Sequence, residues 1–304
     1  MPRARVMTAP VLDFPFPALA RTETDTEPHA QLAAFRLSHL PRHRFIRGVR
    51  WTYLASGTGP EALLMLPGAP GLSETAFQQI PAFEQRFRVI APDLPAAMTT
   101  VADVVDGLAS ILDAEGIART HVLGVSYSGM LAQGLVRRYP GRIDRMVLSH
   151  ARLPGREEAA RFRLAGKLLL ALPLPALRLV IRPARLLLPR EVREHRRFWK
   201  AYYDEIVDRL GRADYASRIL LWLDACRQDW LATEDAPGRW SGEALLLEAD
   251  NDPLIPPRER AALRVLHPRA HIHTFAGTKH SAWIMRQAEY LRVIEDFLRG
   301  ETAG

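Results

Sequence analysis

The fold is decided at Gly124-Val125-Ser126-Tyr127-Ser128-Gly129, where a serine stands between small residues. An apolar run at 121–125 predicts a strand that enters this stretch, and a helical pattern at 128–139 leaves it. A serine on such a sharp strand-to-helix turn presents its hydroxyl at the end of the sheet. The turn needs small neighbours two positions before and after the serine. Gly124 meets this need, whereas Ser128 replaces the usual glycine with a side chain that the turn tolerates with some crowding.

Short apolar runs alternate with helical patterns on both sides of that turn. The strand patterns lie at 62–66, 88–91, 146–149, 244–247 and 271–275. The helical patterns lie at 101–114, 257–266 and 282–298. Because this alternation is typical of parallel βαβ units, we expect an α/β fold with a mostly parallel central sheet flanked by helices.

The alternation breaks at residues 152–240, where the sequence contains only helical patterns. A helical block between two strands of a parallel sheet predicts an inserted cap, or lid. The sheet core then comprises residues 45–151 and 241–304. Residues 1–44 are expected to form an extended N-terminal arm.

The cap contains the most apolar stretch of the chain, Leu164 to Leu188. Lysine, prolines and arginines interrupt this stretch, so it does not predict a membrane span. Arginines recur at helical spacing and leave leucines on the opposite side. This leucine face fits the lining of a hydrophobic substrate cleft or packing on the core, and the alternative is peripheral contact with a lipid surface. The arginines are Arg178, Arg182 and Arg185, and a later helix carries Trp199, Tyr203, Ile206 and Leu210 on one face.

A serine hydroxyl is a weak nucleophile near neutral pH, so a histidine must take its proton and a carboxylate must orient that histidine. On this kind of sheet the chain order is serine, acid, histidine. Asp252 follows the strand pattern at 244–247, and His280 follows the last strand pattern. Because the carboxyl ends of parallel strands gather at one edge, Ser126, Asp252 and His280 are predicted to converge.

Other residues compete for these roles. Asp250 is the rival acid, but Pro253 directly follows Asp252 in a run that favours Asp252. His150 follows a strand and is expected to line the cleft. The rival bases lie in or before the last strand, and they are His267, His271 and His273. The histidines lack ligand-like spacing with carboxylates, so no metal site and no organic cofactor is predicted.

Acyl transfer also needs donors that bind the negatively charged oxygen of the tetrahedral intermediate. The backbone N–H of Tyr127, directly after the serine, is one predicted donor. The second is the backbone N–H of Ala69, in the glycine- and proline-rich loop that follows the strand pattern at 62–66.

Composition limits the partners and the compartment. The net charge is +7, and residues 152–241 contain 18 basic and 12 acidic residues. This excess reflects a general use of arginine or an attraction to anionic substrates or membrane surfaces. No nucleic-acid-binding motif accompanies it, so nucleic acid is not an expected partner. Cys226 is the only cysteine and Asp13 interrupts the apolar N-terminal residues, so we expect a cytoplasmic protein without disulfides or a signal peptide.

Over about residues 45–300 the chain resembles the α/β-hydrolase superfamily. The likeness lies in the serine turn, in the run 252–256 and in the run 277–280, which occur in the family's order. Within the superfamily the chain looks most like the maspardin-like branch. The cues are Phe77-Gln78-Gln79-Ile80, Leu131-Ala132-Gln133, Ile206-Val207-Asp208-Arg209-Leu210 and Ala216-Ser217-Arg218.

Two positions depart from the superfamily pattern. Pro67 stands before the glycine of the oxyanion loop, where many members have histidine. The glycine-rich turn that often follows the fourth strand is reduced to Pro92-Asp93-Leu94-Pro95-Ala96. Both departures affect the geometry of the loops around the serine.

Maspardin is regarded as a binding protein with an incomplete triad, so the resemblance implies a non-catalytic interaction protein as one alternative. All three triad positions are filled here, which favours an enzyme. We therefore expect a serine hydrolase that cleaves an ester or thioester with an apolar part, and its partner is a small-molecule acyl substrate. A hydrolase of carbon–carbon or amide bonds with the same triad is the other alternative.

Overall fold

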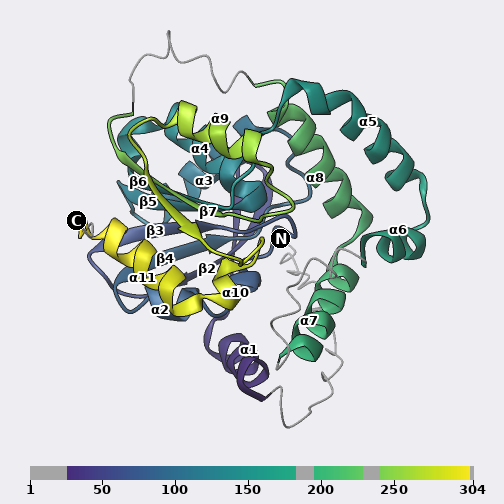
Figure 1. The fold of residues 1–304 in the computed structure, drawn as a ribbon. Coiled ribbons are helices and arrows are strands. Elements are labelled where there is room, and N and C mark those ends of the chain that lie inside the picture. Colours follow the sequence, from purple (N-terminus) through teal and green to yellow (C-terminus); the bar gives the residue numbers. More distant parts are fainter. Residues whose placement is uncertain (1–25, 183–194, 229–239, 302–304) are drawn as a thin grey trace, which may run out of the picture.

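The computed structural model describes residues 26–182, 195–228 and 240–301. Its centre is an eight-stranded sheet in the order β1-β2-β4-β3-β5-β6-β7-β8 (Figure 1). β2 runs antiparallel to β1 and to β4, and the remaining neighbours run parallel. The predicted α/β fold with a mostly parallel sheet is therefore confirmed. The strands are β1 (Arg42–Ile46), β2 (Val49–Ser56), β3 (Glu61–Leu66), β4 (Phe87–Pro92), β5 (Thr120–Val125), β6 (Ile143–Ser149), β7 (Glu243–Ala249) and β8 (His271–Phe275).

Helices cover both faces of this sheet (Figure 1). One face carries α3 (Val101–Ala114), α4 (Gly129–Arg138) and α9 (Pro257–Leu266). The other face carries α2 (Ile80–Phe83), α10 (Ala282–Met285) and α11 (Gln287–Leu298). The sheet is thus the middle layer of three, and its strand ends are free to build a site.

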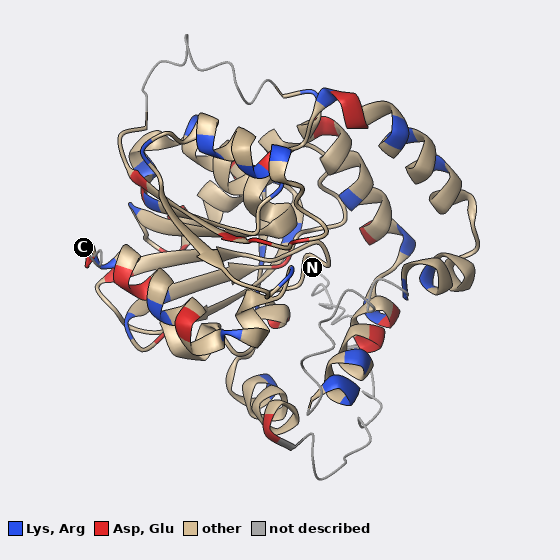
Figure 2. Cartoon of the chain, viewed as in Figure 1, with Lys and Arg blue, Asp and Glu red and all other residues tan. Residues whose placement is uncertain are grey.

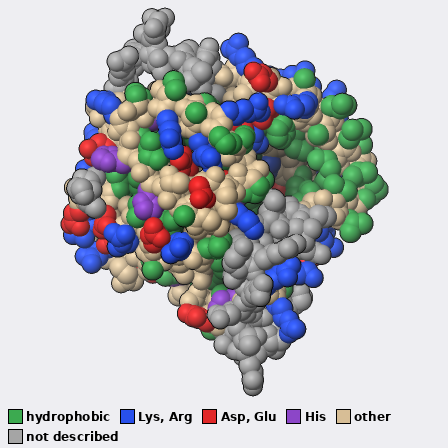
Figure 3. Space-filling view, in the orientation of Figure 1, with side chains coloured by type: hydrophobic (Ala, Val, Ile, Leu, Met, Phe, Trp, Pro, Cys, Tyr) green, Lys and Arg blue, Asp and Glu red, His purple; other side chains and the backbone are tan. Residues whose placement is uncertain are grey.

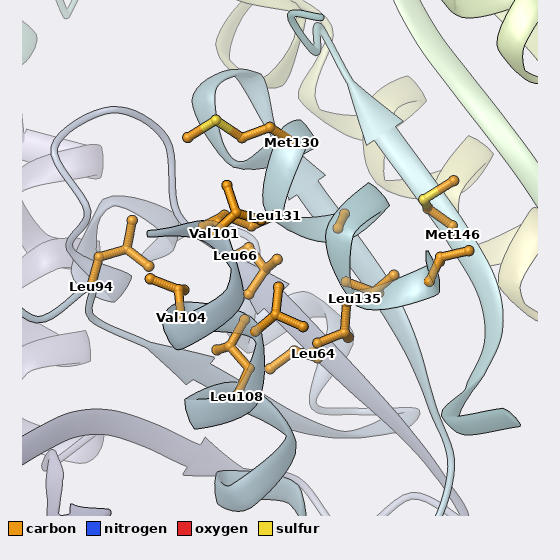
Figure 4. Packing of buried hydrophobic residues seen from close by; sticks show 14 of the residues in the cluster. Leu64, Leu66, Leu94, Val101, Val104, Leu108, Met130, Leu131, Leu135 and Met146 are labelled. Atoms are coloured by element: carbon orange, nitrogen blue, oxygen red, sulfur yellow. The ribbon is translucent and has the colours of Figure 1, made fainter. Parts of the chain in front are cut away.

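Each central strand contributes to two hydrophobic cores because successive side chains point to opposite faces. Leu64 and Leu66 of β3 pack in one core with Leu108 of α3 (Figure 4). Leu63, directly before Leu64, lies in the other core with Ile294 of α11. These side chains are fully or almost fully buried, so β3 is held rigidly where its carboxyl end enters the loop at Pro67.

The structure corrects two predicted elements and adds two. The closing helix is divided at Arg286, whose φ of −133° is not helical, into α10 and α11. The N-terminal arm is not extended at α1 (Thr26–Ser38), which is a helix that buries Leu32 and Phe35. β1 and β2 were not predicted.

Between β6 and β7 the described residues form four helices and no strand. They are α5 (Arg156–Ala171), α6 (Leu174–Ile181), α7 (Arg196–Arg209) and α8 (Arg212–Ala225). Figure 2 shows basic and acidic residues interspersed along α7. Arg182, at the end of α6, pairs with Asp208 of α7 at 2.7 Å, so part of the basic charge of this insertion is neutralised internally.

Some of the leucine-rich stretch lies on the protein surface. Leu164, Leu168 and Leu179 are more than half exposed, and Figure 3 shows hydrophobic side chains gathered over α5 and α6. Arg185 and the end of the stretch lie outside the described residues. In the part of the chain that the structure describes, no helix combines the length and the apolar character needed to cross a bilayer.

Candidate active site

Ser126 sits at the turn between β5 and α4, as the sequence pattern predicts. Its φ is +50°, in the left-handed region that side chains other than glycine rarely adopt. Two glycines permit this turn. A Cβ on Gly124 would lie 2.8 Å from the Cβ of Ala132, and a Cβ on Gly129 would lie 2.4 Å from that of Ala151. The glycines are therefore steric requirements of the bend that presents the serine.

Ser128 fits the turn, and its side chain has a defined partner. It is fully buried, and its hydroxyl donates a hydrogen bond to the backbone carbonyl of Pro67. The hydroxymethyl group that was expected to crowd the turn thus links the serine turn to the loop after β3. This is the loop that carries Ala69, the predicted oxyanion donor.

Ser126, His280 and Asp252 lie within hydrogen-bonding distance in series. His280 Nε2 is 2.9 Å from Ser126 Oγ, and His280 Nδ1 is 2.7 Å from Asp252 Oδ2. The backbone N–H groups of Leu254 and Ile255 donate to Asp252 Oδ1 at 2.8 and 3.2 Å. With Asp252 ionised, Nδ1 donates to the carboxylate, which leaves Nε2 free to accept the serine proton.

Asp250 does not contact His280, although it was the rival acid. Its carboxylate accepts a hydrogen bond from the backbone N–H of Gly277 at 2.9 Å. The neighbouring Asn251 Oδ1 accepts from the backbone N–H of Lys279 at 2.8 Å. These two bonds hold the loop after β7 against the loop after β8, so they set the position of His280 relative to Asp252.

The environment keeps Asp252 ionised. Burial raises the pKa of this carboxyl, but the hydrogen bond and charge of His280 and the Leu254 N–H outweigh burial and lower the pKa below its ordinary value. An ionised carboxylate at this position fixes the tautomer and the orientation of the imidazole.

The rival histidines lie elsewhere in the structure. His267 Nε2 is 3.2 Å from the amide oxygen of Gln133, His273 Nε2 is 3.0 Å from Glu289, and the His271 ring packs near Phe297. None of these contacts involves Ser126.

His150 is buried beside the predicted triad and does not line the cleft as expected. Its ring meets that of His280 edge to face, with the centroids 5.4 Å apart, and stacks on Phe275 from the other side. Burial, with a smaller contribution from His280, lowers the pKa of His150 to about 3. At neutral pH His150 is therefore uncharged, and its ring packs against the imidazole of His280.

A cavity of about 520 Å³ lies in front of Ser126 and His280. Ala69 borders it, as expected of an oxyanion loop. Most of its remaining lining is apolar or aromatic, and a large part of it comes from the segment between β6 and β7. That segment contributes Leu169 of α5, Leu177 of α6, Trp199, Tyr203 and Ile206 of α7, and Leu210 directly after α7. The predicted face of α7 thus lines the cavity, whereas only part of the leucine-rich stretch does.

Arg218 of α8 connects this insertion to the loops around the serine. Its Nη2 donates to the Leu94 carbonyl at 2.7 Å, and the Leu94 N–H donates to the Gly71 carbonyl at 2.8 Å. The Tyr127 hydroxyl donates to the Arg218 carbonyl at 2.7 Å. Sequence reasoning noted Arg218 only within a motif and assigned it no role, because spacing alone did not reveal that it meets both loops.

Arg218 also borders the cavity as a buried cation. Its side chain has no carboxylate within ion-pairing distance among the described residues, and its Nε has no hydrogen-bond partner there. Burial lowers the pKa of the Arg218 guanidinium below its ordinary value. Elsewhere in the described ranges, no cluster of three or more His, Cys, Asp or Glu side chains could hold a metal ion.

The chain is similar to several known proteins. An uncharacterised protein of Mycobacterium tuberculosis is 25% identical over 284 residues, which cover 84% of this chain and 80% of that protein. The 2-hydroxy-6-oxo-2,4-heptadienoate hydrolase of Pseudomonas putida is 27% identical over 267 residues, which cover 81% of this chain and 91% of that protein. The structure of an enol-lactonase from Burkholderia xenovorans LB400 superposes with a TM-score of 0.70 at 19% identity, covering 85% and 100%.

A family model for the alpha/beta hydrolase fold matches residues 61–285, which is most of the chain. The match begins at β3 and ends in α10, so it includes both halves of the sheet and the helices inserted between them. The chain belongs to the alpha/beta hydrolase fold family and is a hydrolase.

Proposed function

We propose that this hydrolase cleaves an ester or thioester with Ser126 as nucleophile, His280 as general base and acid, and Asp252 as the group that orients His280. The observation that carries the proposal is the position of one imidazole, 2.9 Å from the serine hydroxyl and 2.7 Å from the carboxylate. This is the separation at which a base takes a proton from a nucleophile.

The bond changes follow from this arrangement. Ser126 Oγ bonds to the acyl carbon while its proton passes to His280 Nε2. The N–H groups of Ala69 and Tyr127 hold the oxygen that gains negative charge. His280 then gives its proton to the departing alcohol or thiol, which leaves an acyl group on Ser126. A water molecule then attacks the acyl carbon and gives a proton to His280. The bond to Ser126 breaks, His280 returns the proton to the serine, and the acid is released.

The cavity favours a substrate with a substantial apolar part. Aliphatic and aromatic side chains from α5, α6 and α7 form much of its lining, so a hydrocarbon group gains free energy by leaving water there. We assign residues 152–240 as the cap that covers the substrate, with 45–151 and 241–304 as the catalytic core and 1–44 as the N-terminal arm.

Hydrolysis of a carbon–carbon bond is the second candidate. The Pseudomonas putida relative is named as a hydrolase of a dienoate, which is a carboxylate. Arg218 favours a related substrate here, because a buried cation without a carboxylate partner in the described structure is stabilised by an anionic ligand. Product analysis separates the two candidates. Hydrolysis of a carbon–carbon bond divides the carbon chain of a dienoate into two fragments, whereas hydrolysis of a nitrophenyl ester releases nitrophenol.

A non-catalytic interaction protein of the maspardin type is the third candidate, and a fluorophosphonate probe tests it. Such a probe phosphonylates an activated serine, so the wild-type protein should be labelled and should hydrolyse a nitrophenyl ester. Ser126→Ala should abolish both reactions. Ser281→Ala, at another serine that lines the cavity, should retain both. An unlabelled, inactive wild-type protein of intact fold would support the non-catalytic alternative.

A further inference from the structure

Gln79 is a buried polar residue in the cavity that contains Ser126. Its exposed fraction is 5%, and its amide Nε2 has no hydrogen-bond partner among the described residues. The residue precedes α2, and its backbone carbonyl accepts hydrogen bonds from the N–H groups of Ala82 and Phe83. These two hydrogen bonds fix the backbone of Gln79, which belongs to the lining of the cavity.

Two apolar residues flank Gln79 in the chain. Phe77 and Ile80, close to it in the chain, are almost completely buried in the core on that face of the sheet. The neighbouring Gln78 differs, because its amide donates to Gln31 Oε1 at 2.7 Å in an exposed position. A buried unpaired amide costs free energy that an apolar side chain does not, so stability alone does not favour a glutamine at this position.

An unpaired amide has a consequence for substrate choice. In the empty cavity Gln79 Nε2 has almost no surface open to water, so the donor is unpaired before a substrate binds, and a purely hydrocarbon substrate leaves it unpaired. Leaving a buried donor unpaired weakens binding by roughly 5- to 150-fold. A substrate with an oxygen at the matching position avoids this loss.

We propose that Gln79 is a specificity-determining residue that hydrogen-bonds a neutral oxygen, a hydroxyl or a keto group, on an otherwise apolar substrate. The amide carries no charge and can both donate and accept, so either oxygen suits it. The proposal rests on the proposed function and deepens it, because it changes the substrate class from a plain hydrocarbon ester to an oxygenated one.

Matched ester pairs test the proposal in turnover. One series is nitrophenyl alkanoates with and without a hydroxyl or keto group along the acyl chain. The other is alkyl esters with the same oxygens in the alcohol part. The wild-type protein should prefer the oxygenated member of one pair in kcat/KM by about 10-fold or more. Gln79→Leu should remove that preference by slowing the oxygenated ester, while Gln78→Leu should keep it.

Binding to Ser126→Ala protein tests recognition without turnover. Calorimetry with the carboxylic acids and alcohols that correspond to the same esters should show the same preference. Adding Gln79→Leu should remove it. If the wild-type protein hydrolyses no ester but this binding preference is present, the proposed reaction fails and the role of Gln79 stands. If no oxygenated ligand is preferred, or the preference survives Gln79→Leu, the role of Gln79 is overturned. Thermal unfolding shows whether Gln79→Leu is folded.

Discussion

The buried hydroxyl of Ser128 donates a hydrogen bond to the carbonyl oxygen of Pro67. The serine turn departs from the common family pattern at Ser128, and the loop after β3 departs from it at Pro67. The hydrogen bond joins these two residues. Ser128 lies two residues after the nucleophile, and Pro67 lies two residues before Ala69. The bond therefore connects the two loops that carry the predicted oxyanion donors.

Ser128→Ala should slow ester hydrolysis. Without the hydroxyl the Pro67 carbonyl loses a buried donor, which costs about 1–3 kcal/mol, and the loop of Ala69 loses its link to the serine turn. We expect kcat to fall by roughly 10-fold, with a smaller change in KM, because the oxyanion forms only during the reaction.

Ser128→Gly restores the glycine that the family pattern favours, and it should be slowed to the same extent. Ser110→Ala is the control, because Ser110 also donates to a backbone carbonyl, that of Asp106 on α3, but lies outside the cavity lining. If Ser128→Gly were faster than the wild-type enzyme, crowding of the turn by the Ser128 side chain would outweigh the benefit of its hydrogen bond to Pro67.

Asp252→Asn should abolish most activity while leaving the fold intact. An amide favours the wrong tautomer of His280, and the same change in a serine protease lowers kcat by about 10⁴-fold. Asp250→Asn should retain most activity, because Asp250 accepts from the backbone of Gly277 and does not touch His280. Equal losses in the two variants, measured with a nitrophenyl ester, would contradict the assignment of the acid.

The sequence predicted that Ser126, Asp252 and His280 converge, because each follows a strand and the carboxyl ends of parallel strands lie at one edge of a sheet. It did not predict β1, whose residues are largely exposed and which contains His43 and Arg44 without a clear apolar alternation. It also did not predict that Gln79 and Arg218 border the cavity. Their positions depend on how helices far apart in the chain pack around the cavity, and local periodicity does not contain that information.

His150 should make the protein less stable in moderate acid. Its pKa falls from the ordinary 6.5 to about 3 on folding, so below pH 6.5 the unfolded chain binds a proton that the folded protein excludes. The stabilisation is complete above pH 6.5 and is lost as the pH falls toward 3. The slope is at most about 1.4 kcal/mol per pH unit for one proton.

Urea unfolding between pH 7 and pH 4 measures this effect. His150→Phe keeps an aromatic ring against Phe275 but cannot take up a proton, so its free energy of unfolding should fall less steeply with acid than that of the wild-type protein. His43→Phe, at an exposed position, should behave as the wild type does. Parallel curves for wild type and His150→Phe would show that the pKa of His150 does not fall on folding.

Gly124→Ala should lower both stability and activity, because the added methyl group meets backbone as well as side chain. Its Cβ would lie 2.8 Å from the Cβ of Ala132 and 2.9 Å from the backbone oxygen of Ser128, so α4 must move away from β5. Overpacking of this kind costs about 1–3 kcal/mol. The same movement displaces Ser126 from His280, so kcat should fall even at temperatures where the variant is fully folded.

Gly141→Ala is the control, since no atom lies within 4 Å of its added Cβ. An active Gly124→Ala variant with unchanged thermal midpoint would mean that the bend relaxes without moving the serine, and that the close contacts at Gly124 do not hold the nucleophile in place.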